Sequence, residues 1–219
     1  VVPAHMRAGK GAGATRHETE ERFLDAAERL LIEIGYSAIT TRGLAEEAEA
    51  NHGLVHYYFG TMEELFVQVL ERFTARLVAR QRAMYASDMP YVEKWREAMR
   101  YLNRDQPYQK IWWELQAMAW NRPQFRERIA AVHGAWCDAM RGAVAEALAR
   151  YRLDEGPLAA DDWVTLIVAL NEGLILERLS GVRAGHDSLL AGIEAWLARL
   201  EDRAGSSQSA GDLPLPEPA

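Results

Sequence analysis

The sequence predicts an all-α protein of about nine helices, with a three-helix N-terminal head that contains a helix-turn-helix and a larger helical body. Apolar residues recur at helical spacing in most segments of the chain. Prolines and glycines interrupt these segments at positions 90, 107, 123, 156–157 and 181–185. No segment shows the alternation of apolar and polar residues that is typical of a half-buried strand.

Composition limits the class of protein. The 219 residues are 49% hydrophobic, which is enough to bury a sizeable core. A single cysteine, Cys137, excludes an intramolecular disulfide framework and suits a reducing compartment. No apolar run approaches the roughly 20 residues needed to cross a bilayer, and the N-terminus lacks a signal-peptide core. We therefore expect a cytoplasmic protein with no membrane partner.

Four segments are expected along the chain. They are a flexible arm at 1–15, a helix-turn-helix domain at 16–60, an effector-binding and dimerisation domain at 61–203, and a disordered tail at 204–219. The first helix of the head is predicted from one amphipathic stripe, and Gly35 ends it. The stripe consists of Phe23, Ala26, Ala27, Leu30, Leu31 and Ile34.

Residues 40–59 predict two short helices joined by a tight turn. Thr41 is placed to cap the first of them, and Asn51 is placed to cap the second, which runs through Val55 and Phe59. The second helix has too few apolar positions to be held by burial alone, so its polar side should be used. In a helix-turn-helix, that side lies in the major groove of DNA.

A capping box opens the next helix. Thr61 and Glu64 have the required spacing, and apolar positions follow at helical intervals. These positions are Leu65, Phe66, Val69, Leu70 and Phe73.

The order and spacing of several head residues resemble those of the TetR family of one-component transcriptional repressors. The residues that carry the resemblance are Ala26-Ala27, Gly35-Tyr36, Thr40-Thr41, Leu44-Ala45, Gly53, Tyr57-Tyr58-Phe59 and Glu63-Glu64-Leu65. The resemblance implies a homodimeric repressor that binds a palindromic double-stranded DNA operator and is released by a small-molecule effector. It implies no enzyme activity and no cofactor.

Carried over position by position, the resemblance assigns DNA contacts to two helix starts and to the second helix of the motif. The expected DNA-binding residues are Thr41, Arg42, Asn51, His52, Gly53, Leu54, His56, Tyr57, Tyr58 and Thr61. For Tyr57, burial in the head's core is an equally good interpretation.

The charge of the head opposes tight DNA binding. Residues 1–60 hold six basic side chains, Arg7 and Lys10 among them, against nine acidic ones, a net charge of −3. The sequence also departs from the pattern of the family it resembles at two positions. Glu49 stands where the turn usually carries glycine, and Met62 stands where a phosphate-binding lysine is usual. A left-handed Glu49 would cost about 1 kcal/mol more than glycine. One alternative is therefore a ligand-binding helical protein with weakened DNA binding.

The breaks in the body predict helices near 91–102, 108–121, 123–151, 160–179 and 187–203 after the one that starts at Thr61. The helix at 108–121 is apolar round most of its circumference, which predicts a central position. A ligand cavity is expected beside it, for an apolar or aromatic effector, with a cationic aromatic one also open. The expected effector-binding residues are Trp113, Gln116, Trp120, His133, Trp136, Cys137 and Met140. Gln116 could instead be a core amide bonded to backbone.

Cys137 and His133 share one helical face and suggest two further alternatives. A soft metal would need more ligands than these two, so no metal site is expected. A helical enzyme using the pair as nucleophile and base is the weakest alternative, because no orienting carboxylate is evident in the sequence. We expect no catalytic residues.

The last two helices are predicted to form a dimer contact, because paired amphipathic helices at the end of a chain often pack against a symmetry mate. The expected interface residues are Trp163, Ile167, Leu170, Asn171, Leu174, Ile193 and Trp196. The alternative is that these helices only close the core of the monomer.

Overall fold

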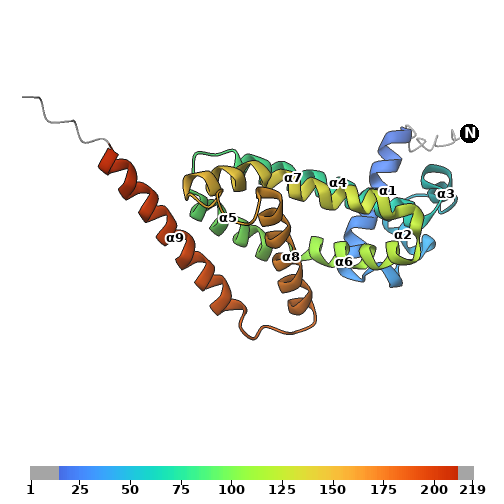
Figure 1. Ribbon diagram of the computed structural model, residues 1–219. Helices are drawn as coiled ribbons and strands as arrows, with labels where there is room; N and C mark the ends of the chain where they lie inside the picture. Colours follow the sequence, from blue (N-terminus) through green and yellow to red (C-terminus); the bar gives the residue numbers. More distant parts are fainter. Residues whose placement is uncertain (1–14, 212–219) are drawn as a thin grey trace, which may run out of the picture. The chain divides into compact units, whose positions relative to one another are not determined.

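The computed structural model describes residues 15–211, with side chains to residue 206, and this part of the chain is entirely helical (Figure 1). It holds nine α-helices and two 3-10 turns, at Tyr36–Ala38 and Pro123–Phe125. The helices are α1 (Arg16–Glu33), α2 (Thr41–Glu47), α3 (Gly53–Phe59), α4 (Met62–Tyr85), α5 (Tyr91–Arg104), α6 (Gln106–Asn121), α7 (Arg126–Arg150), α8 (Ala160–Leu179) and α9 (His186–Gly211). The predicted fold class is confirmed.

The chain forms two compact units, Val1–Leu70 and Glu71–Ala219. The boundary lies within α4, whereas the sequence suggested a division at its start. The reason is that the first turns of α4 belong to the core of the first unit: Leu65 and Phe66 are buried, and the Phe66 ring meets Tyr36 edge-on at 5.2 Å. As a result, α4 contributes to both units.

In the first unit, α1 starts with a complete capping box. Thr15 Oγ1 accepts from Glu18 N at 3.3 Å, and Glu18 Oε2 accepts from Thr15 N at 2.6 Å. The buried face of α1 meets α3 through Phe23, whose ring lies edge-on to Phe59 at 6.1 Å. Gly35, with φ +78°, follows the C-cap of α1 and terminates the helix as expected.

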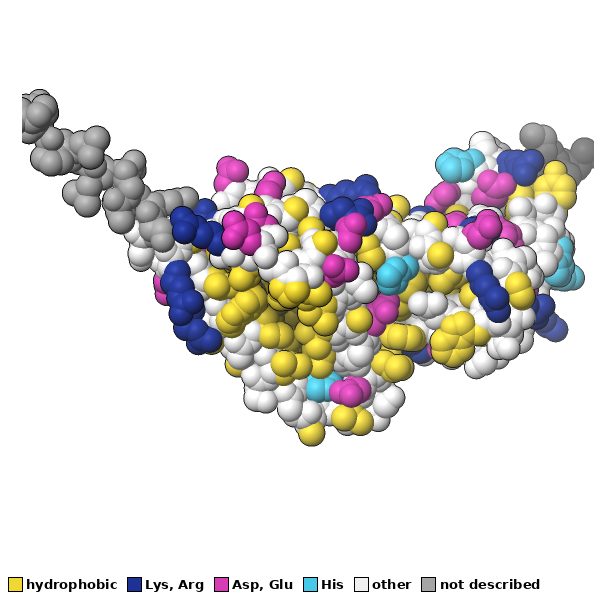
Figure 2. All heavy atoms as spheres, in the orientation of Figure 1, with side chains coloured by type: hydrophobic (Ala, Val, Ile, Leu, Met, Phe, Trp, Pro, Cys, Tyr) yellow, Lys and Arg dark blue, Asp and Glu magenta, His cyan; other side chains and the backbone are white. Residues whose placement is uncertain are grey.

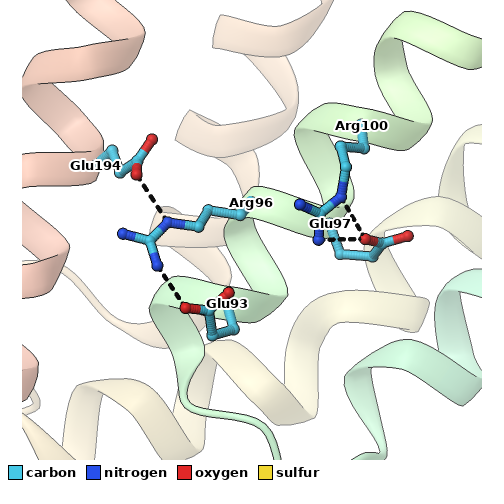
Figure 3. Close-up of polar contacts among 5 residues, drawn as sticks. All are labelled: Glu93, Arg96, Glu97, Arg100 and Glu194. Carbon is cyan, nitrogen blue, oxygen red and sulfur yellow. Dashed lines mark hydrogen bonds and ion pairs between the residues drawn. The ribbon is translucent and has the colours of Figure 1, made fainter.

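The core of the second unit is formed where α7 packs on α8. Its buried residues are Met140, Val144, Leu148, Val164 and Val168. On another side, α5 is tied to α9 by a polar cluster (Figure 3). Arg96 Nε donates to Glu194 of α9 at 2.7 Å, and the same guanidinium pairs with Glu93 one turn earlier on α5.

The C-terminal helix is longer than the sequence predicted. The helix α9 continues to Gly211, so residues 204–211 are helical although they were placed in the tail; the first proline after them is Pro214, and nothing stronger than glycine interrupts the helix before it. The arm at 1–14 and residues 212–219 lie outside the described residues. Within the described residues, no helix has both the length and the apolar character of a bilayer span.

Candidate functional site

The first helix of the motif, α2, is capped by Thr40 and not by Thr41. Thr40 has extended backbone, and its Oγ1 accepts from Gly43 N at 3.1 Å. Thr41 is the first helical residue and is half-buried. Two consecutive threonines offer the same capping chemistry, so residue type alone could not place the cap.

The turn after α2 contains the left-handed residue predicted from the sequence. Glu49 has φ +50°, one of two non-glycine residues with positive φ among those described. Ala50 N donates to Ala45 O at 2.9 Å, which closes the end of α2. Arg22 of α1 donates to the Glu49 carbonyl at 3.4 Å and braces the turn from outside.

The start of α3 differs from expectation by one residue. The N-cap is His52, whose side chain makes no capping hydrogen bond, so Asn51 is not the cap itself. Asn51 Oδ1 nevertheless accepts from Gly53 N at 2.9 Å and satisfies the first amide of the helix. Asn51 thus accepts the hydrogen bond from the residue that precedes the N-cap.

The two sides of α3 have different environments. Val55 and Phe59 are buried and hold the helix on the head. Of the seven predicted contact residues in α3 and just before it, Leu54 and Tyr58 are half-buried and five are exposed: Asn51, His52, Gly53, His56 and Tyr57. Tyr57 is 68% exposed, which excludes core packing for it. The helix therefore presents amide, imidazole and phenol groups to its surroundings.

The described arginines of the head are engaged within the head. Arg42 is well exposed but pairs with Glu46 at 2.9 Å, and Arg16 lies 5.8 Å from the Tyr57 ring and 5.7 Å from the Tyr58 ring. A third pair joins Arg29 to Glu47 at 2.8 Å. Arg7 and Lys10 lie outside the described residues. Free cationic charge is therefore scarce on the described part of the head.

The start of α4 adds backbone amides next to α3. Thr61 is exposed, and its Oγ1 accepts from Glu64 N at 3.1 Å. This hydrogen bond is the one expected from the Thr61–Glu64 spacing. The remaining amides of this helix start can donate to a phosphate without a cation.

A cavity of about 120 Å³ lies inside the second unit, among α4, α5, α6, α7 and α8. Three of the expected effector residues line it: His133, Trp136 and Met140. Its aromatic wall consists of Tyr85, Tyr108, Trp112 and Trp136, and its polar residues are Gln81, Asp105, Gln109, His133, Asn171 and Glu172. The volume is below the range typical of ligand pockets, so a ligand must be small or must displace side chains.

The face of α6 that was expected to line the cavity does not. Trp113, Gln116 and Trp120 are absent from its wall, and Trp120 is 66% exposed. Instead, α6 contributes Tyr108, Gln109 and Trp112. Neighbouring residues on a helix point about 100° apart, and α6 is apolar nearly all round, so the pattern could not select the face.

Tyr108 organises the aromatic wall. Its hydroxyl accepts from Trp136 Nε1 at 2.9 Å and lies 3.2 Å from Thr74 Oγ1. Its ring stacks on Phe73 at 5.4 Å. Burial raises the pKa of Tyr108 to about 12, so its hydroxyl stays neutral at physiological pH.

Cys137 and His133 lie near a carboxylate that the sequence did not reveal. Cys137 Sγ is 3.7 Å from His133 Nδ1, and Glu172 Oε1 on α8 is 3.8 Å from His133 Nε2. Cys137 is half-buried but does not line the cavity, and burial is the main cause that raises the pKa of its thiol. The thiolate that a nucleophile requires is therefore disfavoured. Within the described residues, no three His, Cys, Asp or Glu side chains gather as a metal site.

The residues expected at a dimer interface differ in their burial. Leu174 is buried. The other six, Trp163, Ile167, Leu170, Asn171, Ile193 and Trp196, line a second cavity of about 220 Å³, where α8 and α9 meet α5 and α7. Trp163 stacks on Trp196 at 6.3 Å. These six residues therefore lie together within one chain, and the dimer contact predicted for them stays a prediction.

Two residues that line this cavity, Leu166 and Trp196, are also exposed, and further exposed apolar residues continue from them along α8 and α9. Hydrophobic side chains gather over α8 and α9 in the space-filling view (Figure 2). The exposed residues at helical spacing are Leu166, Ala169, Gly173 and Leu176 on α8, and Leu189 and Trp196 on α9. A side chain added at Gly173 would meet nothing within 4 Å. This surface was missed because all sides of α8 carry apolar residues.

Comparisons with known proteins agree with the head's geometry. Residues 23–69 match the family model described as "Bacterial regulatory proteins, tetR family". The "HTH-type transcriptional repressor Rv3405c" of Mycobacterium tuberculosis (strain ATCC 25618 / H37Rv) is 37% identical over 62 residues, 28% of this chain and 33% of that protein. The chain thus matches about a third of the length of this curated relative.

Solved structures resemble the chain over most of its length. Salmonella enterica GusR has a TM-score of 0.66 at 17% identity and covers 85% of this chain and 97% of its own. The structure titled "multidrug binding protein EbrR complexed with proflavin" has a TM-score of 0.58 at 22% identity, over 83% and 99%. At these identities the likeness establishes the fold alone. The matched region covers the helical body as well as the head.

Proposed function

Because the chain belongs to the tetR family of bacterial regulatory proteins, we propose that it is a ligand-responsive transcriptional regulator. In this proposal it is a homodimer that binds a palindromic operator as a repressor, and a small molecule releases it. The known relatives are named as transcriptional regulators, and the chain's similarity gives no support to an enzyme.

The observation that carries the proposal is the two-sided environment of α3. Val55 and Phe59 hold the helix by burial, while its other side exposes His52, His56 and Tyr57. A helix-turn-helix places such an exposed side in the major groove, where imidazole and hydroxyl groups meet base edges and phosphates. His56 Nδ1 lies 2.9 Å from Gly60 O and Tyr57 packs beside Arg16, while the His52 side chain makes no capping hydrogen bond.

Dimerisation would supply the second recognition helix. The exposed apolar face of α8 and α9 offers Leu166, Leu176 and Leu189 to a symmetry mate, and Gly173 permits close approach of the two α8 helices. Two α3 helices fit adjacent major grooves when they lie about 34 Å apart or a multiple of that distance. A palindromic operator follows from this symmetry.

The helix α4 would couple ligand to DNA. It begins beside α3 in the first unit, and its later residues Gln81 and Tyr85 line the cavity of the second unit. A ligand that prefers one position of α4 would shift the population toward it, and the shift is limited by the ligand's difference in affinity for the two states.

The experiment that tests the proposal is selection of random duplex DNA by the purified protein at low salt. We expect enrichment of a palindrome. His52→Ala and Tyr57→Ala should weaken binding to it, and the matched exposed variant Glu127→Ala on α7 should not. Failure of the wild-type protein to enrich any sequence would refute the proposal.

The second candidate is a ligand-binding protein with weakened DNA binding. It is favoured by the net charge of −3 over residues 1–60 and by the pairing of Arg42 with Glu46. Tight ligand binding by a protein that selects no DNA would support this candidate over repression.

A further inference from the structure

We propose that the cavity of the second unit selects an organic cation, a protonated amine on a small aromatic or apolar body, which Glu172 and Gln81 bind through hydrogen bonds. This inference rests on the proposed function, because it names the class of effector for the same cavity. Two hydrogen-bond acceptors of the cavity wall lack a close donor, and among the described residues no lysine or arginine lines the cavity to serve them.

Glu172 is the first unmatched acceptor. Its side chain lines the cavity from α8 and is half-buried. His133 Nε2 lies 3.8 Å from Glu172 Oε1, which is longer than a hydrogen bond. The imidazole ring is itself held against Trp112, at 6.5 Å between ring centres. A half-buried carboxylate without a close donor favours a ligand that brings one.

Gln81 is the second. It lines the cavity from α4 with only 9% of its surface exposed, and among the described residues its Oε1 has no hydrogen-bond partner. Leaving a buried acceptor unsatisfied destabilises a protein by roughly 1–3 kcal/mol, so such atoms are few and usually have a role. A ligand N–H would satisfy this oxygen.

Three other polar residues of the wall have partners within the chain. Asp105 forms an ion pair with Arg80, and Gln109 donates to the carbonyl of Leu102. Tyr108 is hydrogen-bonded to Trp136. Among the described residues, no lysine or arginine lines this cavity. Unmatched negative charge therefore remains at Glu172 alone.

The rest of the wall suits the same class of ligand. Four aromatic rings surround the cavity, those of Tyr85, Tyr108, Trp112 and Trp136. Aromatic faces attract cations in addition to packing against apolar groups. An anion would be repelled by Glu172 and would meet no lysine or arginine among the described wall residues, and a neutral ligand would leave the charge of the carboxylate uncompensated.

The test is calorimetric titration of the full chain with matched pairs of ligands at neutral pH. Benzylamine and 1-naphthylmethylamine are compared with benzyl alcohol and 1-naphthalenemethanol, which keep the ring and replace the cation by a neutral hydroxyl. We expect each amine to bind at least about tenfold more tightly than its alcohol, the effect of one charge-assisted hydrogen bond.

Three variants assign the effect to residues. Glu172→Gln should bring amine and alcohol affinities within about twofold of each other, while Glu127→Gln, which removes an exposed carboxylate on α7, should preserve the preference. Gln81→Leu should weaken the amines severalfold and leave the thermal midpoint of the free protein unchanged or higher, because it removes an unsatisfied acceptor.

Equal affinity for amine and alcohol, a preference that survives Glu172→Gln, or no binding of either amine at millimolar concentration would overturn the inference. These outcomes are separable from failure of the proposed function. A neutral compound that enters the cavity and releases selected DNA would leave the regulator intact and refute only the cationic class. Failure to select DNA would refute the repressor and leave the amine preference standing.

Discussion

Replacing Glu49 with glycine is expected to stabilise the chain. Glu49 connects α2 to α3 with φ +50°, a conformation that costs an L-residue roughly 1–2 kcal/mol. Glycine adopts it without that penalty but loses about 0.5–1 kcal/mol more conformational entropy on folding. The difference gives a gain of about 0.5–1 kcal/mol in the free energy of unfolding.

Nothing else at this position offsets the gain. Glu49 makes its hydrogen bonds through the backbone: its N–H donates to Glu46 O, and its carbonyl accepts from Arg22. Its side chain is exposed. Both backbone contacts are available to glycine, so the substitution removes strain and one negative charge.

Urea unfolding followed by far-UV circular dichroism measures the effect. With a slope of about 2–3 kcal/mol/M, the midpoint should rise by about 0.3 M with no change in slope. Glu49→Ala is the matched control, because it removes the same carboxylate and keeps an L-residue at positive φ. Equal midpoints for the glycine and alanine variants would refute the conformational argument and assign any gain to charge.

Three further outcomes are expected. If the chain forms the proposed dimer, Gly173→Glu should convert it to monomer in analytical ultracentrifugation, whereas Gly142→Glu on α7, where an added side chain also meets nothing within 4 Å, should preserve it; a dimeric Gly173 variant would place the interface elsewhere. Tyr57→Ala should lower operator affinity by about tenfold and change the unfolding free energy by less than about 0.5 kcal/mol, because the ring is exposed; a large loss of stability would contradict its position. Arg96→Ala should destabilise the chain only slightly, because its ion pairs to Glu194 and Glu93 are partly exposed, and the loss should shrink in high salt; a salt-independent loss would point to packing of its stem.

Local patterns predicted the architecture because each depends on neighbours in sequence. The stop at Gly35 and the left-handed Glu49 follow from turn chemistry, and the Thr61 cap follows from its spacing to Glu64. Where two adjacent residues share the same chemistry, as Thr40 and Thr41 do, that logic cannot choose between them.

The cavity was harder to predict because its wall depends on tertiary contacts. On α6, tryptophans stand at 112, 113 and 120, and only packing against α4, α5, α7 and α8 selects Trp112 for the wall. Glu172 was missed for the same reason, since it comes from α8 and reaches His133 of α7 only in the fold. A sign in the sequence was a carboxylate beside Asn171 within an apolar helix.

The unmatched oxygen of Gln81 gives the proposed coupling a physical basis. Within residues 15–211 this buried acceptor has no hydrogen-bond partner, and it belongs to the helix that also contributes Leu65 and Phe66 to the head's core. A ligand that donates to Gln81 and pairs with Glu172 would connect α4 to α8 through itself. Such a ligand would stabilise only those positions of α4 in which both acceptors reach it, and that difference in affinity is what an allosteric release of DNA requires.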